Sequence, residues 1–318
     1  MGKSSTFSKF VSKYVMILAF LVLVVFFATI SSNFLTATNI SSIVISKVAT
    51  GFLALGGTFI LISDEFDLSL GYNLMFSTII GAMIAQRGGG TLIIVLSMLC
   101  TGMLVGLING ILVVHFKISS FIVTLSVGLT LLGLAQALSG GGVMYVTEPK
   151  PLLDFAKAKI GSNGIGYCVI LFIIVCIILH FIYTHTVFGR QVYAIGISKK
   201  TAFLAGIQVS KIRMLAFVFS GLMAGAGGII YMGQVGTASS SYGSSLLLPA
   251  YSVVFLSKTA FKPGYINIPG LILSLLIVAI GSNGIQLIGA PAWGAYVFEG
   301  AILCFAMWLS TRFNIREE

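Results

Sequence analysis

Three acidic residues stand close together between two apolar stretches, at Asp64, Glu65 and Asp67. In one interpretation, Asp67 and Ser69 lie at a broken helix, where a carboxylate and a hydroxyl could meet the hydroxyl groups of a solute crossing a membrane. In the other, the segment is a solvated cytoplasmic turn and Asp67 caps the helix that follows. The residues themselves leave both interpretations open.

Five further polar side chains lie on otherwise apolar stretches. They are Asn109, Thr124, Gln136, Asn283 and Gln286. Amides both donate and accept hydrogen bonds, which suits a neutral polyol passing between helices. Interhelical hydrogen bonding within a membrane bundle is the alternative.

Two charged residues, Lys47 and Glu299, are isolated within apolar stretches. We expect the Lys47 ammonium to extend to the outer face and Glu299 to pair with another group; a proton relay is the alternative. The four cysteines lie in apolar runs, and the three histidines lack partners at metal-ligand spacing. We therefore expect no metal site and no covalent chemistry.

The composition defines the elements that must position these side chains. The chain has 318 residues, of which 8% are charged and 58% hydrophobic. An ordinary soluble domain carries about 25% charged residues. This composition excludes a soluble enzyme, a disordered chain and a disulfide-rich secreted module, and it predicts an all-α polytopic membrane protein.

At about 20 residues for each crossing, the apolar stretches predict about ten transmembrane helices in a single domain over residues 1–318. The stretches are 14–31, 40–62, 71–86, 92–114, 121–139, 164–183, 212–232, 246–257, 266–288 and 293–310. Within the fourth, Gly102, Gly106 and Gly110 form a face of small residues, which we expect to pack against a neighbouring helix.

The net charge of +10 comes from basic residues scattered singly between apolar stretches, so we expect no nucleic-acid partner. With the N-terminus inside, 13 of the 18 basic residues fall in cytoplasmic segments. Arg87, Lys150, Lys157 and Lys159 fall outside, and Lys47 falls within a span. Because Lys and Arg collect on the cytoplasmic side, both termini are predicted to be cytoplasmic.

A basic cytoplasmic segment is predicted at about 184–211, with cations at Arg190, Lys199, Lys200 and Lys211. Ser198 can cap a short helix that begins at Lys199. We expect Gly196 to break the chain before this helix and Gly206 to end it. Such a helix can lie in the membrane interface or dock into a groove of a partner protein.

This segment closely resembles the cytoplasmic loop of ribose-type sugar permeases, the membrane subunits of ATP-binding-cassette importers. The residues that match the pattern of that family are Phe188, Gly189, Arg190, Tyr193, Ala194, Ile195, Gly196, Ala202, Leu204, Gly206 and Ile207. Further stretches resemble the family in the same order, at Asn33–Ile40, Asp67–Gly71, Asn109–Leu125, Phe219–Ile230 and Ser282–Trp293.

The chain departs from the pattern in two places. Asp64 and Glu65 stand where the family has two glycines, and Leu246–Gly264 lacks the family's acidic residues and most of its glycines. These departures leave open which sugar is carried and whether the second membrane subunit is identical.

The resemblance implies a permease subunit of a sugar importer in a bacterial cytoplasmic (inner) membrane. It implies three partners, namely a cytoplasmic ATPase that holds ATP and Mg, an extracytoplasmic sugar-binding protein, and a second permease copy or a sister permease. This chain would bind no cofactor. Its coupling residues would be Gly189, Arg190, Tyr193, Gly196, Lys199, Lys200, Ala202 and Gly206.

Two other functions remain alternatives. An ion-gradient-driven secondary transporter would carry ionisable residues along a relay, and here only Lys47, Glu299 and Asp67 qualify. A membrane receptor that binds a ligand without moving it is the second. Neither alternative predicts the arginine-containing cytoplasmic loop.

Overall fold

Almost all regular structure in the computed structural model of this chain is helical. The structure describes residues 6–161 and 164–313. Its helices are α1 (Thr6–Ile30), α2 (Ala37–Ser46), α3 (Val48–Ile62), α4 (Leu70–Gln86), α5 (Thr91–Gly110), the π-helical turn η1 (Ile111–His115), α6 (Ser120–Ser139), α7 (Lys150–Lys157), α8 (Tyr167–His185), α9 (Val187–Ile197), α10 (Lys199–Leu204), α11 (Val209–Val235), α12 (Tyr242–Ser257), α13 (Ile268–Leu287) and α14 (Ala292–Phe313).

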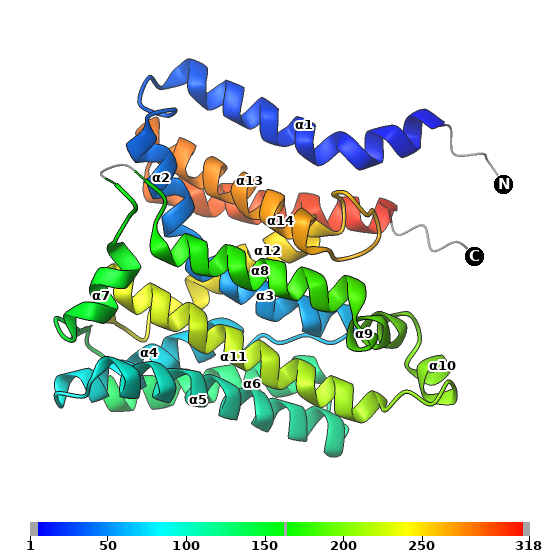
Figure 1. The fold of residues 1–318 in the computed structure, drawn as a ribbon, viewed down its shortest axis with the longest axis horizontal. Helices are drawn as coiled ribbons and strands as arrows, with labels where there is room; N and C mark the ends of the chain where they lie inside the picture. The colour runs from blue at the N-terminus through cyan, green and yellow to red at the C-terminus, as the bar shows by residue number, and fades with distance from the viewer. Residues whose placement is uncertain (1–5, 162–163, 314–318) are drawn as a thin grey trace. The chain divides into compact units, whose positions relative to one another are not determined.

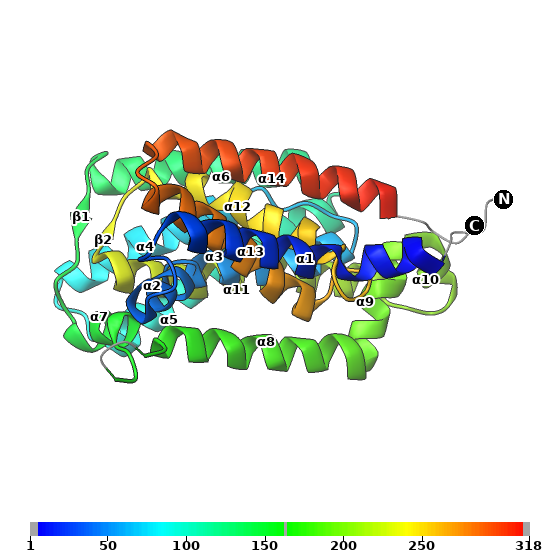
Figure 2. The ribbon, with the colours of Figure 1, turned by 90° about the horizontal axis from the view of Figure 1, so that it is seen from above.

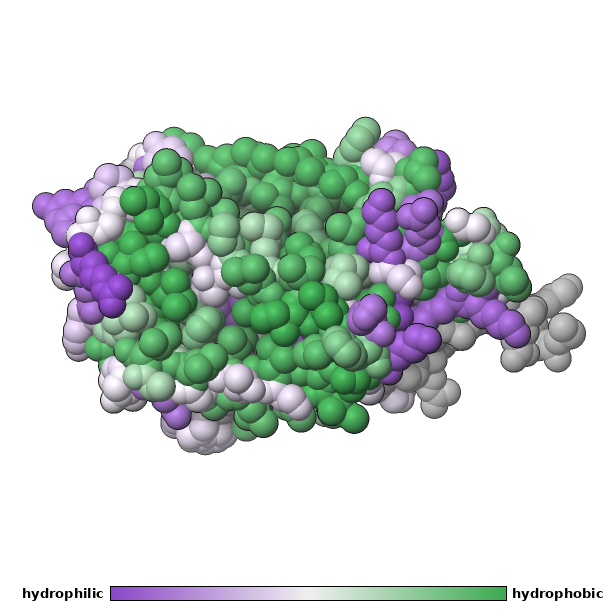
Figure 3. Space-filling model, turned by 90° about the horizontal axis from the view of Figure 1, so that it is seen from below, coloured by the Kyte–Doolittle hydropathy of each residue, from purple (hydrophilic) through white to green (hydrophobic). Residues whose placement is uncertain are grey.

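Among the described residues, six helical segments are long and apolar enough to cross a membrane, where α2 with α3 and α5 with η1 each count as one segment. Four shorter apolar helices accompany them in the same part of the chain. Their exposed surface is also apolar, and Figure 3 shows a face covered mostly by hydrophobic side chains. The helical membrane character expected from the sequence is thus confirmed, while the number of ten spans stays a prediction. One small departure from an all-α chain is an antiparallel pair, β1 (Met144–Tyr145) with β2 (Thr237–Ala238). The pair forms where Gly236, in a left-handed conformation, ends α11.

The chain comprises two compact units. Unit 1 contains residues 1–47, 160–165 and 248–318, and unit 2 contains residues 48–159 and 166–247. In unit 1, α13 packs against α1, α2 and α14. The Phe27 ring of α1 lies directly against Gly284 of α13, where a methyl group would not fit.

Unit 2 is built around α11, which packs against α3, α4 and α5 (Figure 1). Gly102 and Gly106 of α5 lie against the backbone of Gly221 and Phe217 of α11, so close that an added Cβ would collide. The prediction that this glycine face packs against a neighbouring helix is confirmed. Because the glycines lack side chains, the two backbones approach closely and gain extensive van der Waals contact.

The two ends of unit 2 carry different elements. The amphipathic helix α7 lies at one end, and α9 and α10 lie at the other, as both views of the ribbon show (Figures 1 and 2). α8 connects the two ends. Between α3 and α4, residues 63–69 form no regular helix or strand. This segment brings together the polar residues described next.

Candidate functional site

Segment 63–69 begins with a left-handed turn at Asp64, whose φ is 58°. The turn ends α3, because the backbone N–H groups of Asp64 and Glu65 donate to the carbonyls of Leu61 and Ile60. Short polar residues tolerate this conformation better than other non-glycine residues do. The Asp64 side chain is 77% exposed, whereas that of Glu65 is only 6% exposed.

Glu65 joins segment 63–69 to α10 and to α11 through ion pairs within unit 2. Its Oε1 lies 2.8 Å from Lys199 Nζ, at the start of α10, and 2.5 Å from an Arg213 guanidinium nitrogen in the first turns of α11. The Lys199 ammonium also donates to the Asp64 carbonyl oxygen at 3.0 Å. Burial alone would raise the pKa of Glu65. The hydrogen bonds from Lys199 and Ser120 and the charge of Arg213 outweigh burial, and the pKa lies below its ordinary value.

The backbone of segment 63–69 is held by hydroxyls of α6. The Phe66 N–H donates to Ser120 Oγ at 3.2 Å, and the Leu68 N–H donates to Thr124 Oγ1 at 3.0 Å. In a membrane protein, irregular backbone needs such partners because lipid offers none. Thr124, a predicted path residue, therefore supports the segment.

Asp67 lies near the end of the segment that leads into α4, and it is 1% exposed. Its carboxylate accepts hydrogen bonds from the Ser69 N–H at 3.0 Å, from Ser69 Oγ at 2.6 Å and from Ser220 Oγ of α11 at 2.7 Å. Asn109 of α5 donates to Ser69 Oγ at 2.8 Å. The solvated-turn interpretation is thus wrong for Asp67, which is enclosed by packed helices. We call Asp67, Ser69, Asn109 and Ser220 the polar centre.

One atom of the polar centre is unsatisfied. Asn109 Oδ1 is buried and, in the part of the chain that the structure describes, has no hydrogen-bond partner. A buried unpaired acceptor costs about 1–3 kcal/mol. Ser220 completes the centre although the sequence interpretation did not include it. Its only signal was a hydroxyl on an apolar helix.

The other predicted path residues lie elsewhere. Asn283 of α13 exchanges two hydrogen bonds of 3.1 Å with Asn39 of α2, within unit 1. Gln136 on α6 and Gln286 on α13 are exposed. A place along a solute path stays a prediction for all of them.

Lys47 and Glu299 pair with each other in unit 1. Their charged atoms are 3.2 Å apart, and Ser282 Oγ donates to the same carboxylate oxygen at 3.0 Å. That Lys47 extends to the outer face stays a prediction, while its ammonium is held by a mostly buried carboxylate. The expectation that Glu299 pairs with another group is confirmed.

The predicted short helix after Ser198 is confirmed as α10, with Ser198 Oγ accepting from the Thr201 N–H at 3.2 Å. Gly206 ends this turn with a φ of 81°, as expected of a left-handed glycine. Gly196, however, does not break the chain, because it lies inside α9. Its missing side chain instead lets α9 lie against the Ile62 carbonyl at the end of α3.

The outer surface of α10 carries two large apolar side chains. Ala202 is buried within the protein at 3% exposure, whereas its neighbours Phe203 and Leu204 are 69% and 75% exposed. Arg190 and Lys200 are exposed nearby in the chain, Gly189 packs against the backbone of α8, and Tyr193 lies beside Tyr183. We call Phe203 and Leu204 the apolar tip. The sequence pattern places Leu204 on an apolar stripe of this short helix with Ala202 and Ala205, but it did not point to Phe203, although a large apolar residue near two lysines was a signal.

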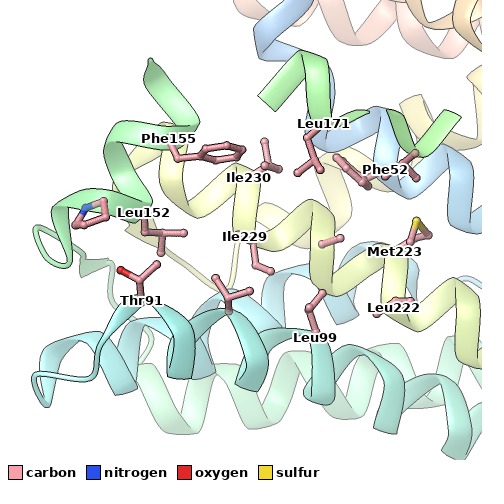
Figure 4. A pocket seen from close by; sticks show the side chains of 14 residues that line it. Phe52, Thr91, Leu99, Leu152, Phe155, Leu171, Leu222, Met223, Ile229 and Ile230 are labelled. Atoms are coloured by element: carbon pink, nitrogen blue, oxygen red, sulfur yellow. The ribbon is translucent and has the colours of Figure 1, made fainter. Parts of the chain in front are cut away.

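A cavity of about 510 Å³ lies in unit 2 between α5, α7, α8 and α11 (Figure 4). Its lining is almost wholly hydrocarbon, from Phe52, Leu99, Phe155, Leu171 and Ile230 among others. Such a lining offers almost no hydrogen bonds to the hydroxyl groups of a polyol. The cavity is therefore poorly suited to bind one.

Comparison with known proteins agrees with this architecture. Residues 39–307 match the family described as the permease component of the branched-chain amino acid transport system. The chain is 29% identical to the L-arabinose ABC transporter permease protein of Azospirillum brasilense, covering 90% of this chain and 85% of that protein. It is 26% identical to the xylose transport system permease protein of Haemophilus influenzae, covering 94% and 96%. It is 27% identical to the ribose import permease protein of Escherichia coli K12, covering 92% and 91%. No solved structure matches the chain.

Proposed function

Since this chain belongs to the family of permease components of the branched-chain amino acid transport system, it is a transport subunit without catalytic activity, and we propose that it carries a monosaccharide. The family description names amino acids, but relatives matching nearly the whole chain are named for arabinose, xylose and ribose. A polyol also suits the amides and hydroxyls on the helices, because each can both donate and accept a hydrogen bond.

The proposed assembly contains three further components. A cytoplasmic ATPase binds ATP and Mg, an extracytoplasmic protein delivers the sugar, and a second permease, identical or related, completes the membrane core. The proposed location of this assembly is the cytoplasmic membrane of a bacterium. The chain crosses that membrane about ten times with both termini inside, and both termini lie outside the described residues.

The observation that carries the coupling role is the apolar tip of α10. Phe203 and Leu204 are exposed on a six-residue helix between the lysines of its first turn and left-handed Gly206. Leaving such side chains in water forfeits about 1.5–3 kcal/mol for each one that could be buried. Docking into an apolar groove of the ATPase would recover this energy.

The polar centre supports a solute path along segment 63–69. Asn109 Oδ1 is an acceptor without a protein partner among the described residues, and it lies beside a non-helical segment that interrupts the bundle. Transporters place binding sites at such interrupted helices. Asp67 and Ser69 would position Asn109, and Thr124 would hold the segment against α6.

The ion-gradient alternative gains little support from the charged residues. Lys47 and Glu299 form an ion pair with each other. A pair that neutralises itself needs no proton exchange, whereas a relay needs groups that change protonation state.

The experiment is reconstitution of the permease with its ATPase and binding protein in vesicles. We expect ATP-dependent uptake of a pentose and none of leucine. Replacing both Phe203 and Leu204 by Ala should weaken ATPase association by about 10- to 100-fold, a typical loss for an apolar anchor.

The matched control replaces Leu92 and Ile93 of α5 by Ala; both are similarly exposed, on a helix long and apolar enough to cross a membrane. This control should leave association unchanged. Unchanged association in the Phe203 and Leu204 variant would reject docking by α10, and uptake of leucine instead of pentoses would reject the sugar.

A further inference from the structure

The ion pairs of Glu65 lie between the proposed docking helix and the polar centre. The docking helix is α10, which begins at Lys199. The polar centre begins at Asp67, two residues after Glu65. Both belong to unit 2.

On the cytoplasmic side, Lys199 alone makes the contact between α10 and Glu65 among the ion pairs of the described residues. Its Nζ lies 2.8 Å from Glu65 Oε1 and 3.0 Å from the Asp64 carbonyl oxygen. The neighbouring Lys200, on the same helix, is exposed. One lysine thus joins α10 to the segment, and the next does not.

At its other end, next to α4, segment 63–69 leads directly into the polar centre. Two extended residues span about 7 Å, and their backbone cannot stretch further. Asp67 is fixed to Ser220 of α11, and Ser69 is fixed to Asn109 of α5. A displacement of α10 must therefore either pull the segment or break the Lys199–Glu65 pair.

The pair is strong enough to transmit such a displacement. Glu65 is 6% exposed and Arg213 19%, whereas Lys199 is 37% exposed, so the shared carboxylate is shielded from water although the lysine is partly solvated. Charge-assisted contacts there are stronger than exposed ones, whereas the 3.5 Å contact of Lys199 with 77% exposed Asp64 adds little.

We propose that Glu65 is a positioning residue that links the movement of α10 to the polar centre through segment 63–69. This inference rests on the proposed function, because it takes α10 to be the element that the ATPase moves. Asp64 and Glu65 stand where the resembling sequence pattern has glycines, so the link belongs to this chain rather than to that pattern.

The test compares Lys199→Gln with Lys211→Gln in the full complex in vesicles. Lys211 is exposed in the first turn of α11. Both variants remove one positive charge from the basic segment 184–211, but only the first removes the contact with Glu65. Arg213 still pairs with Glu65 in Lys199→Gln, so the fold should persist. We expect the sugar transported per ATP hydrolysed to fall about fivefold in Lys199→Gln, the loss typical of one partly buried ion pair, and to stay within about twofold in Lys211→Gln.

A second readout does not depend on the sugar. Backbone hydrogen exchange of residues 63–69 in the complex should change on ATP binding in the wild type and in Lys211→Gln, and should not change in Lys199→Gln. A double variant with Glu65→Gln should be no worse than the worse single variant, because both remove the same link.

The outcomes separate the two proposals. A wild-type complex without ATP-driven uptake of any sugar would reject the proposed function, while hydrogen exchange would still test the link. Equal transport ratios and equal exchange in the two lysine variants would reject the link and leave the proposed function intact.

Discussion

Glu65 keeps its charge in a place where little of its side chain meets water, because two cations face it. Lys199 and Arg213 both contact the same carboxylate oxygen. At this scale, the balance between burial and attraction decides the protonation state. The attraction prevails, and the pKa of Glu65 is lowered.

This shift predicts how stability depends on pH. Because the folded pKa lies below the ordinary value of 4.5, the stabilisation by Glu65 is complete above that value and is lost as pH falls through the folded pKa. The difference in melting temperature between the wild type and Glu65→Gln should stay constant from about pH 5 to about pH 8 and shrink below about pH 4. Thermal melts in detergent would measure it, and a difference that shrinks near neutral pH would contradict the assignment.

Between helices, the close packing of α5 on α11 depends on glycine. Gly102 and Gly106 lie against backbone atoms of α11, which cannot move aside as a flexible side chain can. Gly133 of α6 has no neighbouring atom within 4 Å of an added Cβ. Glycine is thus required for close helix packing in α5, whereas the space around Gly133 of α6 would accept a side chain.

We expect Gly106→Ala to destabilise the protein by about 1–3 kcal/mol, because overpacking forces the helices apart. Gly133→Ala, the matched control, should be neutral or stabilising by up to about 1 kcal/mol, as the helix propensity of alanine implies. Thermal stability followed by size-exclusion chromatography would measure both. Equal melting of the two variants would show that the helix contact tolerates a methyl group.

For the whole molecule, the membrane orientation follows from the distribution of basic residues. α7 and α10 lie at opposite ends of unit 2 (Figure 1). With 13 of 18 basic residues assigned to the inside, α10 should face the cytoplasm and residues 140–163 the outside. The single-domain organisation of residues 1–318 stays a prediction.

Single cysteines at Lys200 and Lys150 would test this orientation after the exposed Cys100 and Cys304 are replaced by serine. An impermeant thiol reagent added outside intact cells should label the cysteine at position 150 and not the one at position 200. In inside-out vesicles the pattern should reverse. Labelling of position 200 from outside would overturn the topology and with it the docking of α10.

Features that depend only on neighbouring residues could be predicted from the amino-acid sequence. Long apolar runs specify helices because each backbone group bonds within the same segment. Ser198 caps α10, and Gly206 ends its turn in a left-handed conformation, because both depend on residues a few positions away. The membrane class followed from the composition in the same way.

Contacts between residues far apart in the chain could not be predicted from the sequence and are seen in the folded structure. Hydropathy places Lys47 and Glu299 in apolar stretches but does not reveal that they pair. Nor does a row of acidic residues show that Glu65, and not exposed Asp64, is the one enclosed by Lys199 and Arg213. The burial of Ala202 beside exposed Phe203 likewise depends on how α10 packs. These outcomes depend on contacts between segments far apart in the chain, and local pattern carries no record of such contacts.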